Sequence, residues 1–136
     1  MTDHSPPSTA LQVTLFSFGF KYGPPTDVNM IWDVRFLPNP YWDESLRPLT
    51  GLTSGVSDFV LHSDKGAAFL QLLEPLFRFV IEENRSTGKE TFKVAIGCTG
   101  GRHRSVAVVE SLKAIVSEMP VALTLYHRDI ERDNKL

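Results

Sequence analysis

The residues best suited to chemistry lie together in one short segment, residues 97–105, which reads Gly-Cys-Thr-Gly-Gly-Arg-His-Arg-Ser. An apolar run of strand composition (residues 92–96) precedes it, and an apolar run of helical character (residues 106–116) follows it. A strand, a glycine-rich turn and a helix start together direct unpaired backbone N–H groups and the positive end of a helix dipole at one point. Two arginines and a histidine bring further donors to that point. The segment therefore predicts a binding site for a phosphate-like anion.

The same segment supports a second chemical interpretation, because its cysteine, second arginine and serine have the pattern Cys-x5-Arg-Ser. This pattern resembles the active-site loop of cysteine-dependent phosphatases, in which a thiolate at a helix N-terminus attacks the phosphate. Cys98 would then be the nucleophile, and Arg104 would hold two phosphate oxygens. Gly97 stands where those enzymes usually have histidine, and the general acid would have to be Asp33 or Asp43.

A purely structural interpretation of these residues also stays open. The glycines would then serve only a tight turn between strand and helix, and Cys98 would be a small buried hydrophobe, as most free cysteines are. His103 would be a surface residue of the first helical turn. Asp33 follows an apolar run, and a buried carboxylate needs a partner, so its structural role would be a salt bridge with Arg35 or Arg104.

The composition limits what kind of protein this is. With 136 residues, the chain is long enough for one domain, which we place at residues 11–136 after a polar, proline-bearing and disordered start at residues 1–10. The 14 basic and 16 acidic residues give a net charge of −2, which argues against a surface built for non-specific nucleic-acid binding. A single cysteine excludes an internal disulfide, and no apolar run approaches the roughly 18 residues of a membrane span. We expect a cytoplasmic location and no membrane partner, and, because the histidines lack metal-ligand spacing, no metal and no cofactor.

Hydrophobic patterns outline the elements that must position the segment. Short apolar runs predict strands, and periodic apolar residues predict helices. The expected strands are residues 11–18, 30–34, 92–96 and 121–126, and the expected helices are residues 57–62, 64–84 and 106–116. This order predicts an α/β fold, with a mixed, partly parallel sheet, helices packed on its faces and at least one right-handed crossover. Ligands of such sheets bind beyond the carboxyl ends of the strands, where residues 97–105 lie.

The helix expected at residues 64–84 carries two specific predictions. Pro75 lies inside it and should kink it or divide it into two pieces. One face of the helix should be buried, formed by Phe69, Leu72, Leu73, Leu76, Phe77 and Val80.

Four segments of the sequence, distributed over most of the chain, resemble segments of one known protein family. They are residues 17–23 (Ser-Phe-Gly-Phe-Lys-Tyr-Gly), 33–40 (Asp-Val-Arg-Phe-Leu-Pro-Asn-Pro), 46–51 (Leu-Arg-Pro-Leu-Thr-Gly) and 96–105. Over about residues 11–128, these segments resemble the C-terminal domain of the RNase adapter protein RapZ family. The resemblance implies a non-catalytic sensor domain that binds a phosphorylated amino sugar, glucosamine-6-phosphate. It also implies contacts with a small regulatory RNA and an endoribonuclease.

The resemblance and the residue chemistry together define one candidate ligand site. Its members are Asp33, Arg35, Tyr41, Cys98, Thr99, Gly100, Gly101, Arg102, His103, Arg104 and Ser105. None of them is assigned a catalytic role here, whereas the phosphatase interpretation would use Cys98, Arg104 and Asp33. An aromatic cluster adjoins the proline loop and would form either a wall for a sugar ring or anchors for the loop: Trp32, Phe36, Tyr41 and Trp42.

Three features depart from the family pattern. No Gly-x4-Gly-Lys-Ser/Thr motif occurs, so we expect a domain that stands alone, without the P-loop domain of family members, and we transfer no ATP or GTP binding. Tyr22 and Tyr41 stand where histidine is usual, and a phenol carries no charge at neutral pH, which leaves the identity of the ligand open. The basic residues near the C-terminus are balanced by acidic ones, which weakens the case for RNA contacts. An RNA or protein interaction module whose anion site contacts a nucleic-acid phosphate stays open as a third interpretation.

Overall fold

The computed structural model describes residues 10–132, so the prediction of disorder for residues 1–10 lies almost wholly outside the described residues. Four strands form one sheet: β1 (Gln12–Gly19), β2 (Met30–Asp33), β3 (Thr91–Cys98) and β4 (Ala122–His127), in the order β2-β3-β1-β4. The predicted α/β fold is confirmed. All three strand pairings are parallel, so the described sheet is more uniform than the mixed sheet we expected. Parallel pairing brings the carboxyl ends of the four strands to one edge.

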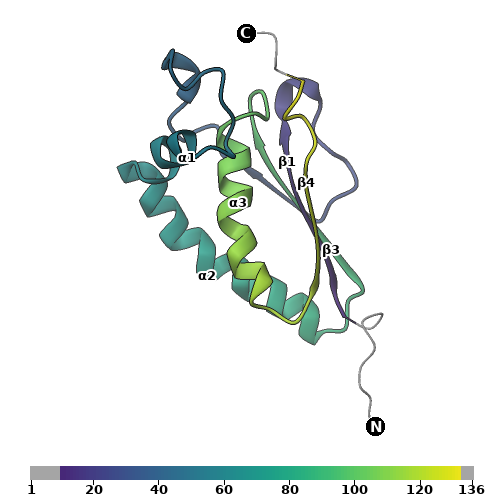
Figure 1. Ribbon diagram of the computed structural model, residues 1–136. Coiled ribbons are helices and arrows are strands. Elements are labelled where there is room, and N and C mark those ends of the chain that lie inside the picture. Colours follow the sequence, from purple (N-terminus) through teal and green to yellow (C-terminus); the bar gives the residue numbers. More distant parts are fainter. Residues whose placement is uncertain (1–9, 133–136) are drawn as a thin grey trace.

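Three α-helices cover one face of the sheet (Figure 1). They are α1 (Ser54–Leu61), α2 (Asp64–Ser86) and α3 (Arg104–Ser117), and two short 3-10 helices, η2 (Phe20–Tyr22) and η3 (Pro40–Trp42), lie in the loops. Helix α3 packs against β1, β3 and β4, while α2 packs against α1 and α3. No described helix is both long enough and apolar enough to cross a membrane.

The other face of the sheet has no α-helix among the described residues, although the sequence suggested helices on both faces. The connection from β1 to β2 explains the difference, because it contains η2 and then Gly23 and two prolines, which do not support a longer helix. A small apolar cluster of Phe16, Phe18 and Ala95 lies on this face, and Phe20 and Val28 pack against it.

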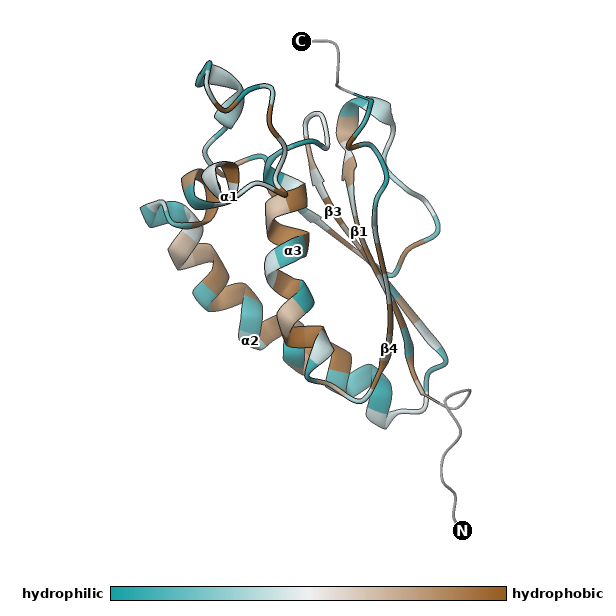
Figure 2. Cartoon of the chain, viewed as in Figure 1, coloured by the Kyte–Doolittle hydropathy of each residue, from teal (hydrophilic) through white to brown (hydrophobic). Residues whose placement is uncertain are grey.

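The core lies between the sheet and the helices. Strands β1 and β3 have the same burial pattern, and their last five residues are all buried. The residues of helix α3 from Arg104 to Val109 are all buried. Buried residues therefore lie on both sides of the loop that joins β3 to α3. Figure 2 shows the hydrophobic residues on the strands and on the inner sides of the helices.

The structure corrects the predicted division of α2 and part of its predicted buried face. The helix runs through Pro75 without division. Proline removes the N–H that would bond to the carbonyl of Gln71, and since both residues are exposed, water can satisfy that carbonyl. Two residues of the predicted buried face are exposed instead, Leu72 at 75% and Leu76 at 42%.

Close packing against α1 explains the rotation of α2. A Cβ at Gly66 would collide with the backbone carbonyl of Val60, so the start of α2 packs directly on the end of α1. This contact turns Gly66, Leu73, Phe77 and Ile81 inward, and all four are buried. Hydrophobic periodicity alone did not reveal the contact, because glycine carries no apolar signal.

Candidate functional site

The glycine-rich loop, residues 99–103, joins β3 to α3 at the carboxyl edge of the sheet. Gly101 has a φ of +77°, and a Cβ there would lie 2.6 Å from the backbone nitrogen of Gly19. A Cβ at Gly19 would in turn lie 2.5 Å from the carbonyl carbon of Gly100. Glycine is therefore required on both sides, because the loop backbone packs directly on the end of β1.

The backbone N–H groups of residues 99–103 donate no hydrogen bond to any other group within residues 10–132. Two residues further along the chain, the N–H of Ser105 donates to the sulfur of Cys98 with an N–S distance of 3.4 Å. Since these groups precede the first turn of α3, they lie at the positive end of its dipole. The loop therefore presents several adjacent backbone N–H groups that can donate hydrogen bonds to an anion.

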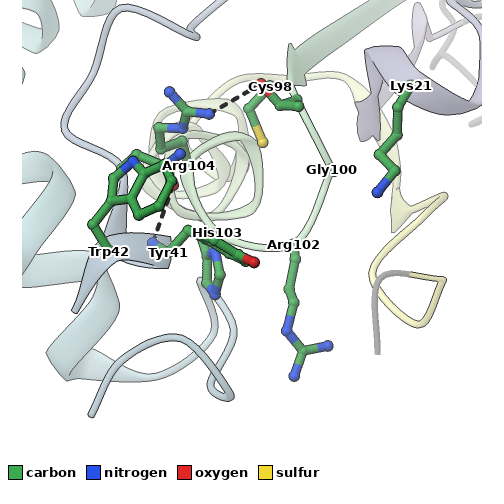
Figure 3. Close-up of a pocket in the computed structure, with 10 residues that line it drawn as sticks. Lys21, Tyr41, Trp42, Cys98, Gly100, Arg102, His103 and Arg104 are labelled. Atoms are coloured by element: carbon green, nitrogen blue, oxygen red, sulfur yellow. Dashed lines mark hydrogen bonds between the residues drawn. The ribbon is translucent and has the colours of Figure 1, made fainter. Parts of the chain in front are cut away.

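A cavity of about 320 Å³ adjoins the loop (Figure 3). Its volume is in the range of small-molecule sites. Ten residues line it: Lys21, Asn39, Tyr41, Trp42, Cys98, Thr99, Gly100, Arg102, His103 and Arg104.

The cavity brings together seven of the eleven candidate ligand-binding residues, and four are not among its lining residues: Asp33, Arg35, Gly101 and Ser105. Two lining residues, Lys21 and Asn39, were missed by the sequence analysis, whereas Trp42 was considered as part of an aromatic wall. Lys21 belongs to η2 and Asn39 precedes η3, both far from the loop in sequence. The only early signal was that Lys21 and Asn39 fall inside two of the four family segments.

Arg104 is buried, at 5% exposure, and its guanidinium already holds neighbouring backbone. Nη1 donates to the carbonyl oxygens of Arg35 at 2.6 Å and Leu37 at 3.3 Å, and Nη2 donates to Oγ1 of Thr99 at 3.3 Å. Burial lowers the pKa of Arg104, while Cys98 and Asp33 act in the opposite direction. Arg104 therefore ties the segment after β2 to the glycine-rich loop.

Arg102 and His103 also make structural contacts. Arg102 donates through Nη2 to the carbonyl oxygen of Pro48 and through Nη1 to that of Ile130 at 3.3 Å. Nε2 of His103 lies 3.0 Å from the carbonyl oxygen of Arg47, so this nitrogen carries the hydrogen. Burial lowers the pKa of His103, which keeps the ring neutral. Figure 3 shows the Arg102 guanidinium directed away from Cys98 and Arg104, so it is not aimed at the loop as the sequence suggested.

Cys98 is 2% exposed, and its sulfur lies 3.1 Å from the hydroxyl oxygen of Ser105. This is the pair that the Cys-x5-Arg-Ser pattern predicts. Glycine is required at the preceding position, because a Cβ at Gly97 would collide with the ring of Phe18. Histidine, which phosphatases usually have there, does not fit.

Asp33 lies at the surface, not buried as its place after a strand suggested. Its carboxylate accepts from Nε and Nη2 of Arg35 at 3.0 and 2.7 Å, and both side chains are almost half exposed. These hydrogen bonds lower the pKa of Asp33. The guanidinium of Arg35 also lies 4.0 Å from the centre of the Phe20 ring. The salt bridge offered as a structural alternative for Asp33 is therefore present.

The buried carboxylate beneath the loop is Asp129, at 0% exposure. It accepts from the backbone N–H of Gly19 at 2.8 Å and pairs with Arg128 at 2.8 Å and with Arg132 at 3.3 Å. Sequence reasoning missed it because Gly19 and Asp129 are 110 positions apart.

Two of the four aromatic residues near the proline loop line the cavity, and the other two anchor the loop. Tyr41 and Trp42 line the cavity, and Trp42 is 77% exposed. Trp32 and Phe36 pack edge-on against Phe69 of α2 and anchor the loop.

Comparisons with known proteins place the chain in a family. The family model of the RapZ C-terminal domain matches residues 11–131. A nucleotide-binding protein of Corynebacterium jeikeium is 49% identical over 130 residues, covering 96% of this chain and 43% of the relative. Nucleotide-binding proteins of Mycobacterium ulcerans and Mycobacterium tuberculosis are 50% and 48% identical over 122 residues, covering 89% of this chain and 40% of each relative. The chain spans about two fifths of the length of these relatives.

Proposed function

Because this chain belongs to the RapZ C-terminal domain family, we propose that it is a non-catalytic regulatory module that binds a phosphorylated small molecule in the cavity beside residues 99–103. The observation that carries the proposal is the set of backbone N–H groups in that loop, which have no acceptor within residues 10–132. Buried or crowded donors without partners are costly, and a phosphate at this helix N-terminus would accept from several of them at once.

The ligand class follows from the rest of the cavity. Arg104 lies beside the loop and supplies positive charge, and Lys21 lines the opposite side in Figure 3. Tyr41 and Trp42 offer an aromatic surface with a hydroxyl group, which suits a sugar ring. The choice of an amino sugar such as glucosamine-6-phosphate rests on family membership. Asp33 as acceptor for a sugar hydroxyl or amine stays a prediction, since Asp33 is not among the residues that line the cavity.

Calorimetry with a ligand series tests the proposal. Glucosamine-6-phosphate should bind, and glucosamine without phosphate should not. Arg104→Lys keeps the positive charge but loses the planar guanidinium, which hydrogen-bonds both to the loop and to the segment after β2. We therefore expect about 5- to 150-fold weaker binding of the ligand. Arg78→Lys is the matched control, because Arg78 is exposed and pairs only with Glu118 among the described residues. Equal affinity for both ligands, or an unchanged affinity in Arg104→Lys, would contradict the proposal.

Phosphatase chemistry is the second candidate, favoured by the 3.1 Å contact between the Cys98 sulfur and the Ser105 hydroxyl. The low exposure of Cys98 and the position of Asp33 outside the cavity lining count against it. Release of phosphate from an aryl phosphate should be absent in the wild-type chain. A turnover that Cys98→Ser abolishes while binding persists would establish the enzyme instead.

Contacts with a regulatory RNA and an endoribonuclease, and a location in the cytoplasm, are proposed from family membership alone. Any RNA contact should be weak and only modestly salt-dependent, because few basic residues would neutralise RNA phosphates. A gel shift with structured RNA at low and at physiological salt is the test. No shift at low salt would remove RNA from the list of partners.

A further inference from the structure

A second cavity, of about 440 Å³, lies on the face of the sheet opposite the α-helices. Its floor is formed by β1, β3 and β4, and residues 25–28 of the connection from β1 to β2 form its wall. Figure 1 shows this connection on the side of the sheet away from the helices. Among the described residues, none lines both this sheet-face cavity and the cavity beside residues 99–103. Because parallel sheets are ordinarily covered on both faces, an open cavity of ligand size on this face needs an explanation.

The floor of the sheet-face cavity consists of a polar row and an aromatic row. Thr14 of β1 lies directly between Lys93 of β3 and Thr124 of β4. Two residues further along the strands, Phe16 and Tyr126 are neighbours on the same face, and their rings stack at 4.7 Å with an angle of 4°. Phe16 is buried, whereas Tyr126 is 43% exposed. The floor therefore suits a ligand with an aromatic part beside a hydrogen-bonding part.

The charged side chains that line this cavity are already paired. Nζ of Lys93 lies 3.2 Å from the carboxylate of Asp27. The guanidinium of Arg128 pairs with Asp129 at 2.8 Å and donates to the carbonyl oxygen of Gly23 at 2.7 Å. Within residues 10–132, each charged group of the cavity thus has an opposite charge beside it. A charged ligand would have to compete with these ion pairs.

The neutral polar groups of the cavity have no such partners. The hydroxyl groups of Thr14, Thr124 and Tyr126 form no hydrogen bond with any group in the described part of the chain. A hydroxyl can both donate and accept. The groups that remain available to a ligand are therefore uncharged, and they accept either a donor or an acceptor.

We propose that the sheet-face cavity binds an uncharged planar heterocycle with donors and acceptors along its edge, which is the chemistry of a nucleoside base. The ring of the ligand packs against Tyr126, and its edge faces the hydroxyl groups of Thr14 and Thr124. This site differs in place and in chemistry from the anion site beside residues 99–103, and it does not rest on the function proposed for that site.

Nuclear magnetic resonance of the full chain, with adenosine as the probe, tests the site. Adenosine should shift the backbone amide signals of β1, β4 and residues 25–28, and leave those of residues 99–103 in place. Ribose, which lacks the base, should cause no shift. Binding should be equal at low and at high salt, because the ligand carries no charge. Glucosamine-6-phosphate should not displace adenosine, so a failure of this site and a failure of the anion site are distinguishable.

Substitutions in the polar row test the orientation of the ligand. Thr14→Val and Thr124→Val each remove one hydroxyl, and each should weaken adenosine binding by about 2- to 12-fold. Thr91→Val is the matched control, because Thr91 is an exposed residue of β3 on the same face and does not line the cavity, so binding should be unchanged. Thr124 is also exposed, so its variant gives the result even if Thr14→Val fails to fold.

Substitution in the aromatic row tests the ring contact. Tyr126→Leu keeps an apolar side chain but removes the ring, and it should weaken adenosine binding by about fivefold or more. Circular dichroism melting verifies that each variant folds.

Three results would overturn the proposal. One is the absence of any shift up to the solubility limit of adenosine. Another is equal affinity in wild type, Thr124→Val and Tyr126→Leu. The third is tighter binding of 4-hydroxybenzoate than of adenosine, lost at high salt, which would assign the cavity to an aromatic acid held by Lys93 or Arg128.

Discussion

Arg104 has a structural role that is visible in its contacts, and the proposed ligand site would use the same side chain. Its guanidinium bonds to two backbone carbonyls of the segment after β2 and to Thr99 of the loop. A lysine has no planar fork and cannot reach these acceptors at once. We therefore expect replacement of Arg104 to disturb both the position of the loop and the affinity for the ligand, so binding and melting temperature should be measured in the same variant.

Gly101 is the residue on which the shape of the loop depends most directly. Gly101→Ala would strain a φ of +77° and place a Cβ 2.6 Å from the Gly19 nitrogen. Gly88→Ala is a matched control, because its φ of +79° is similar and no heavy atom lies within 4 Å of the added Cβ. We expect Gly101→Ala to cost about 2 kcal/mol more free energy of unfolding than Gly88→Ala, and to abolish ligand binding.

Urea denaturation of both alanine variants measures this difference in the free energy of unfolding. Equal values for the two would show that the close approach of the loop to β1 is not a constraint. Binding retained in Gly101→Ala would argue that the loop backbone does not hold the anion.

At the scale of elements, a buried polar chain links β1, β4 and α3. The hydroxyl of Ser17 lies 2.7 Å from Nδ1 of His127, and Nε2 of His127 lies 2.8 Å from the carboxylate of Glu110. The carboxylate accepts from Nε2–H, and the hydroxyl then donates to Nδ1. Although these residue types resemble a hydrolytic triad, Ser17 is 0% exposed, so no substrate reaches it. The chain is a structural link between the last strand and the helix behind the site.

Removing the middle of this chain should be costly. His127→Ala leaves Ser17 and Glu110 without their partner, and we expect a loss of about 1–3 kcal/mol in the free energy of unfolding. His62→Ala is the control, because His62 pairs with Asp58 only at the surface of α1 and should cost less than about 0.5 kcal/mol. Thermal denaturation of the two variants gives the comparison, and equal losses would contradict the structural role of the chain.

At the scale of the whole molecule, the helices cover one face of a parallel sheet and the loops gather at its carboxyl edge (Figure 1). Segments from all parts of the chain meet there: η2, η3, the glycine-rich loop and the turn after β4. The site is therefore a property of the complete fold, and no single segment could form it alone.

The sequence by itself determined the α/β class, the approximate strands and helices, and the place of the loop between β3 and α3. These features depend on local patterns, because apolar periodicity and glycine spacing act over a few residues. The unpaired N–H groups at the start of α3 follow from the same local pattern, since a helix start always leaves such donors.

Only the tertiary structure decided where the side chains point. Arg102 and His103 bond to the segment at residues 47–51, and Asp129 bonds to Gly19 across most of the chain. Such contacts join positions far apart in sequence, and a string of residues carries no direct signal for them. The rotation of α2, which leaves Leu72 exposed, likewise depends on its contact with α1. Local chemistry therefore predicts an anion site at the loop, while long-range packing determines which side chains line the cavity beside the loop.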